Sequence, residues 1–490
     1  MNDIGDIAFL SATELGAAIK ARQVSPTEAV EAYLERIDRI DPKVNSYITV
    51  TADQARQEAL QAEAEIRRGG YRGPLHGIPI AVKDQIYTKG VRTTDASKIR
   101  SDFVPKEDAT VVANLKQAGA ILLGKLNMSE FAHGEPQSSA FGPARNPWDL
   151  SRSPGVSSTG SGAATAARLC ATSLGEDTGG SIRGPAANCG LVGLRPTWGR
   201  VSRYGVDGAG WSFDTIGPIS RTVEDCAITI GGIAGYDPKD PSTHRAPVPD
   251  YQAALTGDLK GLKVGVVKEL IDPVELDLDP QMREAVLAAI TVLAELGAEV
   301  REVSMPLAEK TGYITRAITH VDRVSLRPEW LRERPEDYHY NTRVHFTTAN
   351  LIPAQVYYKA QKLRTMVRNQ VLGLLEDVDV LIQPTSGRPA NIINMDQNVV
   401  SQDGAKSALA AGGFRGPYSL SGAPALSILC GFTSDPSRAG GEGINDSGGL
   451  PLAMQIAGRP FDEATVLRVA HAYEQAVTWN QRIPPAALPI

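Results

Sequence analysis

Hydrophobic spacing in the first 70 residues predicts helices. Apolar side chains recur every three or four positions across residues 29–37, which is helical spacing. Ser11 and Ser25 each stand three residues before a glutamate, a spacing typical of a helix-starting capping box, and Pro26 suits a first helical turn. A third helix is expected over residues 52–68, where a pair of glycines ends the pattern.

From residue 78 onward, short apolar runs alternate with helical stretches. Strands are expected at residues 78–82, 120–123, 191–194, 263–267, 299–303, 378–382, 425–429 and 452–456. Helices are expected at residues 109–117, 162–171, 223–233 and 280–296. This alternation predicts an α/β fold, with a central mixed, mostly parallel twisted sheet covered by helices on both faces.

The chain is expected to form one structural domain. Residues 1–72 would be an N-terminal helical scaffold packed on a catalytic core of residues 73–490. Two tracts rich in turn-forming residues, 237–249 and 435–449, look like surface connectors. Neither tract separates the motifs described below, so a single large domain is the preferred interpretation.

Composition narrows the class of protein. Among 490 residues, 42% are hydrophobic and 22% charged, so a large core is available, and 50 basic against 56 acidic side chains leave a net charge of −6. No basic cluster favours nucleic acid, no apolar run is long enough to span a membrane, and the first residues do not resemble a signal peptide. Four scattered cysteines lack zinc or redox spacing and fit a cytoplasmic protein with reduced thiols.

Candidate chemistry lies in a small-residue segment, 154–181, that carries Ser157 near its start and Ser181 at its end. Glycine lets backbone N–H groups approach a ligand closely, and successive N–H groups in a turn form an anion-binding concavity. A serine nucleophile also needs a base, and Lys83 follows the apolar run of residues 78–82. Burial at the end of such a strand would favour the uncharged amine that a base requires.

Each of these residues also has a structural explanation. Lys83 could extend to solvent or pair with Asp84, Ser157 could cap the following helix, and Ser181 could be a turn residue. A Ser-His-Asp triad has no local support, because the chain has seven histidines but no GxSxG motif. Residues 119–125 fit a GxxxxGK phosphate-binding pattern, but an apolar interior and a following leucine argue against nucleotide binding.

The order of the motifs resembles the amidase signature hydrolases. The matching blocks are residues 73–84, 124–131, 141–148, 175–183, 424–427 and 450–458, among them Gly-Glu-Asp-Thr-Gly-Gly-Ser-Ile-Arg at 175–183. The resemblance implies the fold of that family and a Ser-cis-Ser-Lys triad. Ser181 would be the nucleophile, Ser157 the bridging serine held through a cis peptide bond, and Lys83 the base.

The resemblance also implies roles for the residues around the triad. It assigns the oxyanion hole to four backbone N–H groups, those of Thr178, Gly179, Gly180 and Ser181. It gives Asp177 and Arg183 the role of bracing this loop. The sequence departs from the family's usual Gly-Gly-Ser-Ser-Gly-Gly by carrying Val156 and Thr159 beside the bridging serine, which leaves the local geometry and pocket width open.

The predicted function is hydrolysis of an amide or amide-like C–N bond, in an amide, anilide, ureide or carbamate, through an acyl-serine. No cofactor or metal is expected. The partner is expected to be a small amide-type substrate, not nucleic acid or a membrane. Whether the chain forms a homodimer is left open. Tyr204, Trp211 and Phe213 are candidates for the substrate pocket, and residues 137–141, 204–213 and 311–351 for variable regions that set specificity.

One alternative remains within the same family, the glutamine-hydrolysing subunit of an aminoacyl-tRNA amidotransferase complex. That branch usually carries Arg-Arg-Ile-Met-Leu-Gly-Thr before its Tyr-x-x-Ala-Gln block. This chain has Thr-Arg-Val-His-Phe-Thr-Thr at residues 342–348 instead. The stretch therefore favours a stand-alone amidase over the subunit.

Overall fold

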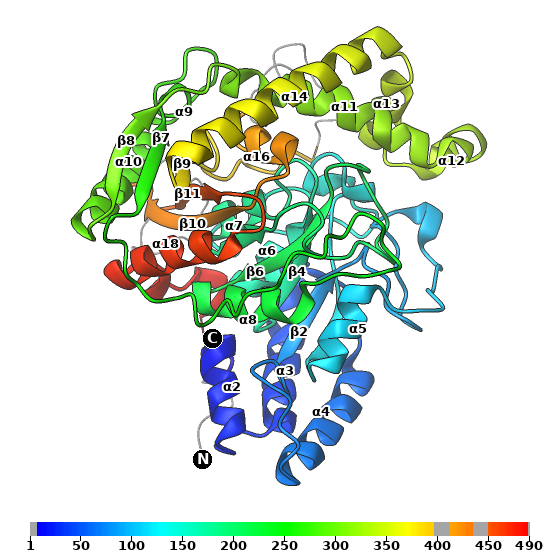
Figure 1. Cartoon of the computed structure of the whole chain (residues 1–490). Helices are drawn as coiled ribbons and strands as arrows, with labels where there is room; N and C mark the ends of the chain where they lie inside the picture. Colours follow the sequence, from blue (N-terminus) through cyan, green and yellow to red (C-terminus); the bar gives the residue numbers. More distant parts are fainter. Residues whose placement is uncertain (1–6, 396–411, 435–448, 489–490) are drawn as a thin grey trace.

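A single eleven-stranded sheet runs through the molecule. The computed structural model describes residues 7–395, 412–434 and 449–488. The strand order is β1-β3-β2-β4-β6-β5-β10-β11-β9-β7-β8 (Figure 1). The strands are β1 Tyr47–Val50, β2 Pro79–Lys83, β3 Ile121–Leu126, β4 Thr172–Asp177, β5 Val192–Arg195, β6 Thr215–Ser220, β7 Lys263–Val267, β8 Glu299–Val303, β9 Val380–Pro384, β10 Ala425–Phe432 and β11 Pro451–Gly458.

The sheet is mixed, as expected, but it is not mostly parallel. In the described residues, four strand pairings are parallel and six are antiparallel. The parallel pairs β3-β2-β4 and β8-β7-β9 lie toward the two ends of the sheet, and the strands between them alternate in direction. Parallel neighbours need a crossover connection, whereas antiparallel neighbours do not. The apolar runs in the sequence therefore predicted where strands lie but not the direction in which each strand runs.

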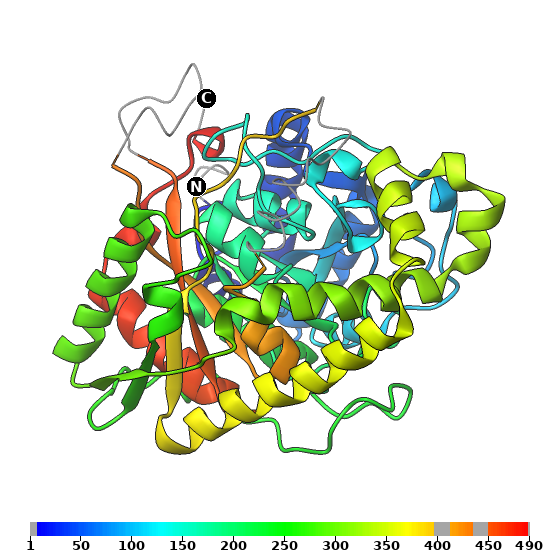
Figure 2. The same cartoon turned by 90° about the horizontal axis from the view of Figure 1, so that it is seen from above.

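Helices pack on both faces of the sheet (Figures 1 and 2). The helices are α2 Ala12–Lys20, α3 Pro26–Val44, α4 Ala52–Arg67, α5 Thr110–Gln117, α6 Thr159–Ala166, α7 Arg183–Cys189, α8 Val223–Ile233, α9 Lys268–Ile271, α10 Pro280–Glu295, α11 Thr311–Leu326, α12 Pro328–Glu333, α13 Tyr340–Ala349, α14 Ala354–Asp377, α16 Gly416–Ser421 and α18 Glu463–Ala476. Within the described ranges, no helix is long and apolar enough to cross a membrane.

Most of the predicted elements form at the expected positions. Both capping boxes are present, with Ser11 and Ser25 accepting hydrogen bonds at the starts of α2 and α3. All eight predicted strands are found, with small differences at their ends. The helix expected over residues 162–171 is α6, which begins earlier and ends at Ala166, because Arg168 turns into the left-handed region at φ 58°.

Three strands were not predicted. β1 lies among the N-terminal helices, and β4 and β6 read TSLGED and TIGPIS, without the apolar run of a buried strand. Tertiary packing buries β4 and β6 along their whole length, overriding their weak local signal.

The N-terminal segment contributes three helices and the edge strand β1, which pairs antiparallel with β3. The division of the chain at residue 72 therefore stays a prediction. Residues 237–249 form a connector without helix or strand, as expected, whereas residues 435–448 of the second connector lie outside the described residues.

The segment between β8 and β9 forms its own helical layer. α11 and α14 lie side by side in both views, and together with α16 they enclose a second apolar core that includes Ile314, Ile318 and Tyr418. This layer stands over the loops that follow the central strands, so it is placed to contribute to a site there.

Glycine at position 217 in β6 is required by close packing in the sheet. A Cβ at Gly217 would collide with the carbonyl oxygen of Leu194 in the neighbouring strand. We expect Gly217→Ala to lower the free energy of unfolding by about 2 kcal/mol, measured by denaturant titration. The same change at the exposed helical Gly373, which has open space around it, should instead stabilise by up to about 1 kcal/mol.

Equal effects at the two glycines would contradict this packing argument, since the chemical change is identical and only the surroundings differ.

Candidate active site

The carboxyl ends of two neighbouring parallel strands define the site. β2 and β4 pair in parallel, with Ile80 opposite Thr172 and Val82 opposite Leu174. β2 ends at Lys83, and β4 continues into the glycine-rich loop that carries Ser181. Because parallel strands end at the same edge of a sheet, residues distant in the chain meet there.

Lys83 and Ser157 are in direct contact. Lys83 Nζ lies 2.8 Å from Ser157 Oγ in a hydrogen bond, and both side chains are buried. The peptide bond between Val156 and Ser157 is cis. The hydroxyl of the neighbouring Ser158 instead donates to the carbonyl oxygen of Glu176 in β4 and accepts from the N–H of the same residue. Of the two adjacent serines, the structure therefore brings Ser157 to the lysine.

A second group touches the lysine. Glu176 Oε2 lies 3.0 Å from Lys83 Nζ, and its other oxygen accepts a hydrogen bond of 2.7 Å from Thr178 Oγ1. Both Lys83 and Glu176 have no exposed side-chain surface. The Lys83 amine is thus held between one hydroxyl and one carboxyl group.

Burial pushes both members of this pair toward their uncharged forms. It lowers the pKa of Lys83, an effect that the nearby Glu176 carboxylate opposes. It raises the pKa of Glu176 to about 7, against the attraction of Lys83 and with further help from Asp214. An amine that acts as a base must be uncharged, so the direction of the Lys83 shift suits that predicted role.

Ser181 ends the short loop that follows Glu176 and β4. Its side chain is partly exposed, and in the described part of the chain it forms no hydrogen bond. A hydrogen bond between Ser181 and Ser157 is therefore not formed in this state, and the relay between them stays a prediction. Catalytic hydrogen bonds often tighten only when substrate is bound.

The loop before Ser181 offers three of the four backbone donors that the sequence predicts. Gly180 N–H donates to Asp177 Oδ1 at 2.8 Å, so it is not available to an oxyanion. The N–H groups of Thr178, Gly179 and Ser181 have no acceptor among the described residues. The predicted set of oxyanion donors therefore no longer includes Gly180. The role of the other three N–H groups remains a prediction.

Asp177 and Arg183 lie beneath this loop. Besides Gly180, the Asp177 carboxylate accepts hydrogen bonds from Ile182 N–H and from the side chains of Arg183 and Arg195. Burial would raise the pKa of Asp177, but the two guanidinium groups outweigh it, and the pKa lies below its usual value. Arg183 also binds Ser419 and Gln455, which ties the loop to α16 and β11.

The three aromatic residues suggested for a substrate pocket do not form one cluster. Phe213 is fully buried in the apolar core, whereas Trp211 is 65% exposed and lies against Arg203. The Tyr204 hydroxyl donates to Glu107 at 2.9 Å near the surface. A common pocket lined by all three is therefore not what the structure contains.

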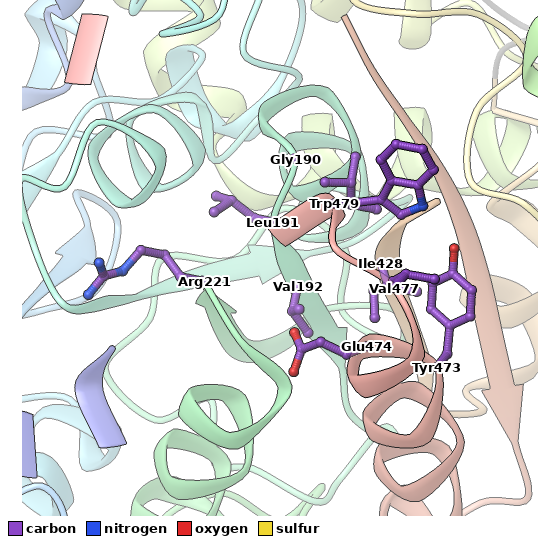
Figure 3. Close-up of a pocket in the computed structure, with 10 residues that line it drawn as sticks. Gly190, Leu191, Val192, Arg221, Ile428, Tyr473, Glu474, Val477 and Trp479 are labelled. Atoms are coloured by element: carbon purple, nitrogen blue, oxygen red, sulfur yellow. The ribbon is translucent and has the colours of Figure 1, made fainter. Parts of the chain in front are cut away.

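Two cavities elsewhere contain none of the predicted catalytic residues. One, between β5, β10 and α18, is lined by Val192, Glu474 and Trp479 among others (Figure 3), and its volume of about 10 Å³ holds at most one water. The other, about 280 Å³, lies between the segment around Leu75 and that around Tyr251. Neither reaches the group around Lys83.

Glu176 is the one residue in contact with the lysine that sequence reasoning missed. It lies inside the motif at residues 175–183, but β4 was not predicted, so nothing indicated that its side chain would face Lys83. The signal that would have found it is the parallel pairing of the two motif-bearing strands.

Comparison with known proteins gives concordant results. The amidase family model matches residues 28–467. A glutamyl-tRNA(Gln) amidotransferase subunit of Geobacter metallireducens is 42% identical, covering 96% of this chain and 98% of the relative. The protein of the same name from Geobacillus kaustophilus is 41% identical, covering 97% and 98%.

Solved structures agree. The corresponding glutamyl-tRNA(Gln) amidotransferase subunit of Thermotoga maritima is 32% identical with a TM-score of 0.76, covering 96% of this chain and 94% of that one. A bacterial aryl acylamidase of the amidase signature family is 26% identical with a TM-score of 0.86, covering 99% and 100%. A vestigial protein complex related to an s-triazine catabolic enzyme matches with 33% identity and a TM-score of 0.85, covering 95% and 98%.

The contact between Glu176 and Lys83 predicts a change in pH dependence. The Glu176 carboxylate raises the pKa of Lys83, so its removal in Glu176→Gln lowers that pKa and frees the amine at lower pH. We measure the rate at which a serine-directed phosphonate labels Ser181 as a function of pH. The pH at which this rate rises on the acid side should fall by about one unit, and the maximal rate should be lower because the base is weaker.

The matched control is Glu474→Gln, the same change at a buried carboxyl outside this group. An unshifted profile in Glu176→Gln, or an equal shift in the control, would show that Glu176 does not act on the base.

Proposed function

This chain belongs to the amidase family, and we propose that it hydrolyses an amide-type C–N bond through an acyl intermediate on Ser181. The observation that carries the proposal is the 2.8 Å contact between buried Lys83 and Ser157, at the edge of the loop that ends in Ser181. A lysine with lowered pKa, a bridging hydroxyl and a partly exposed serine are the parts that acyl transfer needs.

Acylation would proceed by one proton relay. Ser181 Oγ attacks the carbonyl carbon while its proton passes to Ser157, which gives its own proton to Lys83. The N–H groups of Thr178, Gly179 and Ser181 would hold the resulting oxyanion. The relay then runs in reverse, the leaving nitrogen takes the proton as the C–N bond breaks, and an acyl-serine remains.

Deacylation would use the same groups. A water molecule takes the place of the departed amine, loses its proton to the relay and attacks the acyl carbon. The carboxylic acid leaves and Ser181 recovers its proton. In both halves Lys83 is briefly an ammonium, and the Glu176 carboxyl 3.0 Å away is near enough to stabilise that charge.

For the substrate, the comparisons favour glutamine. The relatives with 42% and 41% identity over nearly the whole chain are named as a subunit of a glutamyl-tRNA(Gln) amidotransferase. We therefore infer that a glutamine-hydrolysing subunit is better supported than a stand-alone amidase, which reverses the preference based on residues 342–348. In that role the chain would work with other subunits that receive the ammonia.

A stand-alone amidase is the second candidate. Residues 342–348 lie in α13 and differ from the stretch usual in the amidotransferase branch, and the aryl acylamidase shares the fold with a TM-score of 0.86. The proton relay is identical in both cases, and it uses only side chains of this chain, without a cofactor. Three further statements remain predictions: neither nucleic acid nor a membrane is a partner, the chain could form a homodimer, and it is located in the cytoplasm.

Loss of the nucleophile should abolish the reaction, and loss of the base should slow it strongly. We expect Ser181→Ala to lose turnover and phosphonate labelling, and Lys83→Ala to lose about 10³-fold in rate, measured by release of ammonia or amine. Ser325→Ala, an exposed serine on α11, is the control for labelling. Labelling at another serine in Ser181→Ala would overturn the assignment of the nucleophile.

The two substrate classes can be separated with the isolated chain. A glutamine-hydrolysing subunit should release ammonia from glutamine and leave aryl anilides almost untouched, whereas a stand-alone amidase should show the reverse. A hydrolysis screen across glutamine, simple amides, anilides, ureides and carbamates, with Ser181→Ala as background, measures this. Fast anilide hydrolysis without any glutaminase activity would reject the amidotransferase role.

A further inference from the structure

One face of α11 lies against the loop that carries Ser181. Thr315, Arg316, Thr319, His320 and Arg323 follow the spacing of a single helical face. At its start, Thr315 Cγ2 would be only 3.7 Å from a Cβ placed on Gly179. The rest of this face therefore extends from the nucleophile loop, and it is rich in cations.

Arg323 organises the far end of this face. Its guanidinium donates hydrogen bonds to His133 Nδ1 at 2.8 Å and to the carbonyl oxygen of Ala132 at 3.3 Å. Because arginine only donates, His133 Nδ1 must accept, which leaves His133 Nε2–H to donate to His345 Nδ1 at 2.8 Å. The two imidazoles are thus held neutral and in fixed tautomers by the arginine.

The positive charge of Arg323 is not balanced by a direct ion pair. Among the described residues, no carboxylate lies within ion-pair distance of Arg323. Asp322 beside it is bonded to Tyr357. Burial lowers the pKa of Arg323, and the negative charges of Asp214, Glu176 and Asp322 oppose this without a direct ion pair.

Those nearby carboxyl groups already have partners of their own. Asp214 accepts the backbone N–H groups of Ala209 and Gly210, and Glu176 is bonded to Lys83 and Thr178. Arg316 has a carboxylate near it, that of Glu135, which raises its pKa. Arg323 is partly exposed, but its Nε is buried. A guanidinium that is partly removed from water without a carboxylate partner is costly unless a ligand supplies the charge.

Several buried donors on or beside this face lack an acceptor. Thr315 is only 8% exposed and its Oγ1 has no hydrogen-bond partner in the described structure. The atoms His320 Nε2, Arg323 Nε and Arg415 Nε are also buried without a hydrogen-bond partner, although their residues are partly exposed, and Arg415 lies over Gly180. Burial, with Arg316 and Arg323 nearby, lowers the pKa of His320 to about 3, so its ring is neutral at physiological pH.

We propose that Arg323 and the α11 face around it bind a carboxylate carried by the amide substrate. The inference rests on the proposed function, because it places this carboxylate on the molecule whose amide Ser181 attacks. The class of substrate is then an amide that bears an anionic group at its other end. Glutamine, with its α-carboxylate, belongs to that class.

The test uses two compounds that differ in charge and share a carbon chain, the monoamide of glutaric acid and its diamide. Protection of Ser181 from a serine-directed phosphonate reports binding without requiring turnover, and ammonia release reports kcat/KM where turnover occurs. We expect the anionic monoamide to protect at concentrations at least about tenfold lower than the neutral diamide does.

Arg323→Gln should weaken protection by the monoamide about tenfold and leave the diamide within about twofold, whereas Arg323→Lys should restore part of the difference. Arg332→Gln, an exposed arginine on the adjacent α12, is the matched control, and melting temperatures verify that each variant is folded. Equal protection by both compounds, or an equal loss for both in Arg323→Gln, would overturn the carboxylate site. Absence of phosphonate labelling at Ser181 in the unaltered protein would instead overturn the proposed function.

Discussion

The site depends on keeping an amine and a carboxyl group together where neither is exposed to solvent. Lys83 ends one strand, Glu176 lies near the end of its parallel neighbour, and the sheet brings their side chains to 3.0 Å. In water each group would ionise independently, but burial favours the uncharged forms of both while their attraction favours the ion pair. This balance brings the charged and uncharged forms of the pair closer in free energy, which suits the role of base proposed for Lys83. Everything else in the site is arranged around that pair.

The loop after β4 has to be both tight and rigid. Gly180 adopts φ +118°, and a side chain there would run into Arg415, so only glycine fits this turn. The turn is fixed from below by Asp177, whose carboxylate is held by two backbone N–H groups and two arginines. A charged group this well satisfied holds its position, and it fixes the backbone of the loop that ends in Ser181.

The two halves of the site have different origins in the chain. The proposed reacting groups come from motifs shared with the amidase family, at the ends of the parallel strands β2 and β4. The cationic face comes from α11, in the segment 311–351 that is predicted to be variable. Such a division fits a scaffold in which the proton relay is constant while the helical layer above it selects the substrate. It also explains how relatives with different named activities share one fold over nearly their whole length.

The sequence by itself determined the apolar strands and the capped N-terminal helices, and it singled out Lys83, Ser157 and Ser181 as candidates, because periodicity and motif order are local properties. It did not determine the direction of the central strands, the participation of β4 and β6, or the place of Glu176, which lies 93 positions from its partner. Nor could it separate Phe213, buried in the core, from Trp211, exposed at the surface. Contacts between distant residues follow from which strands pair and in which direction, and that choice is made by the packing of the whole sheet.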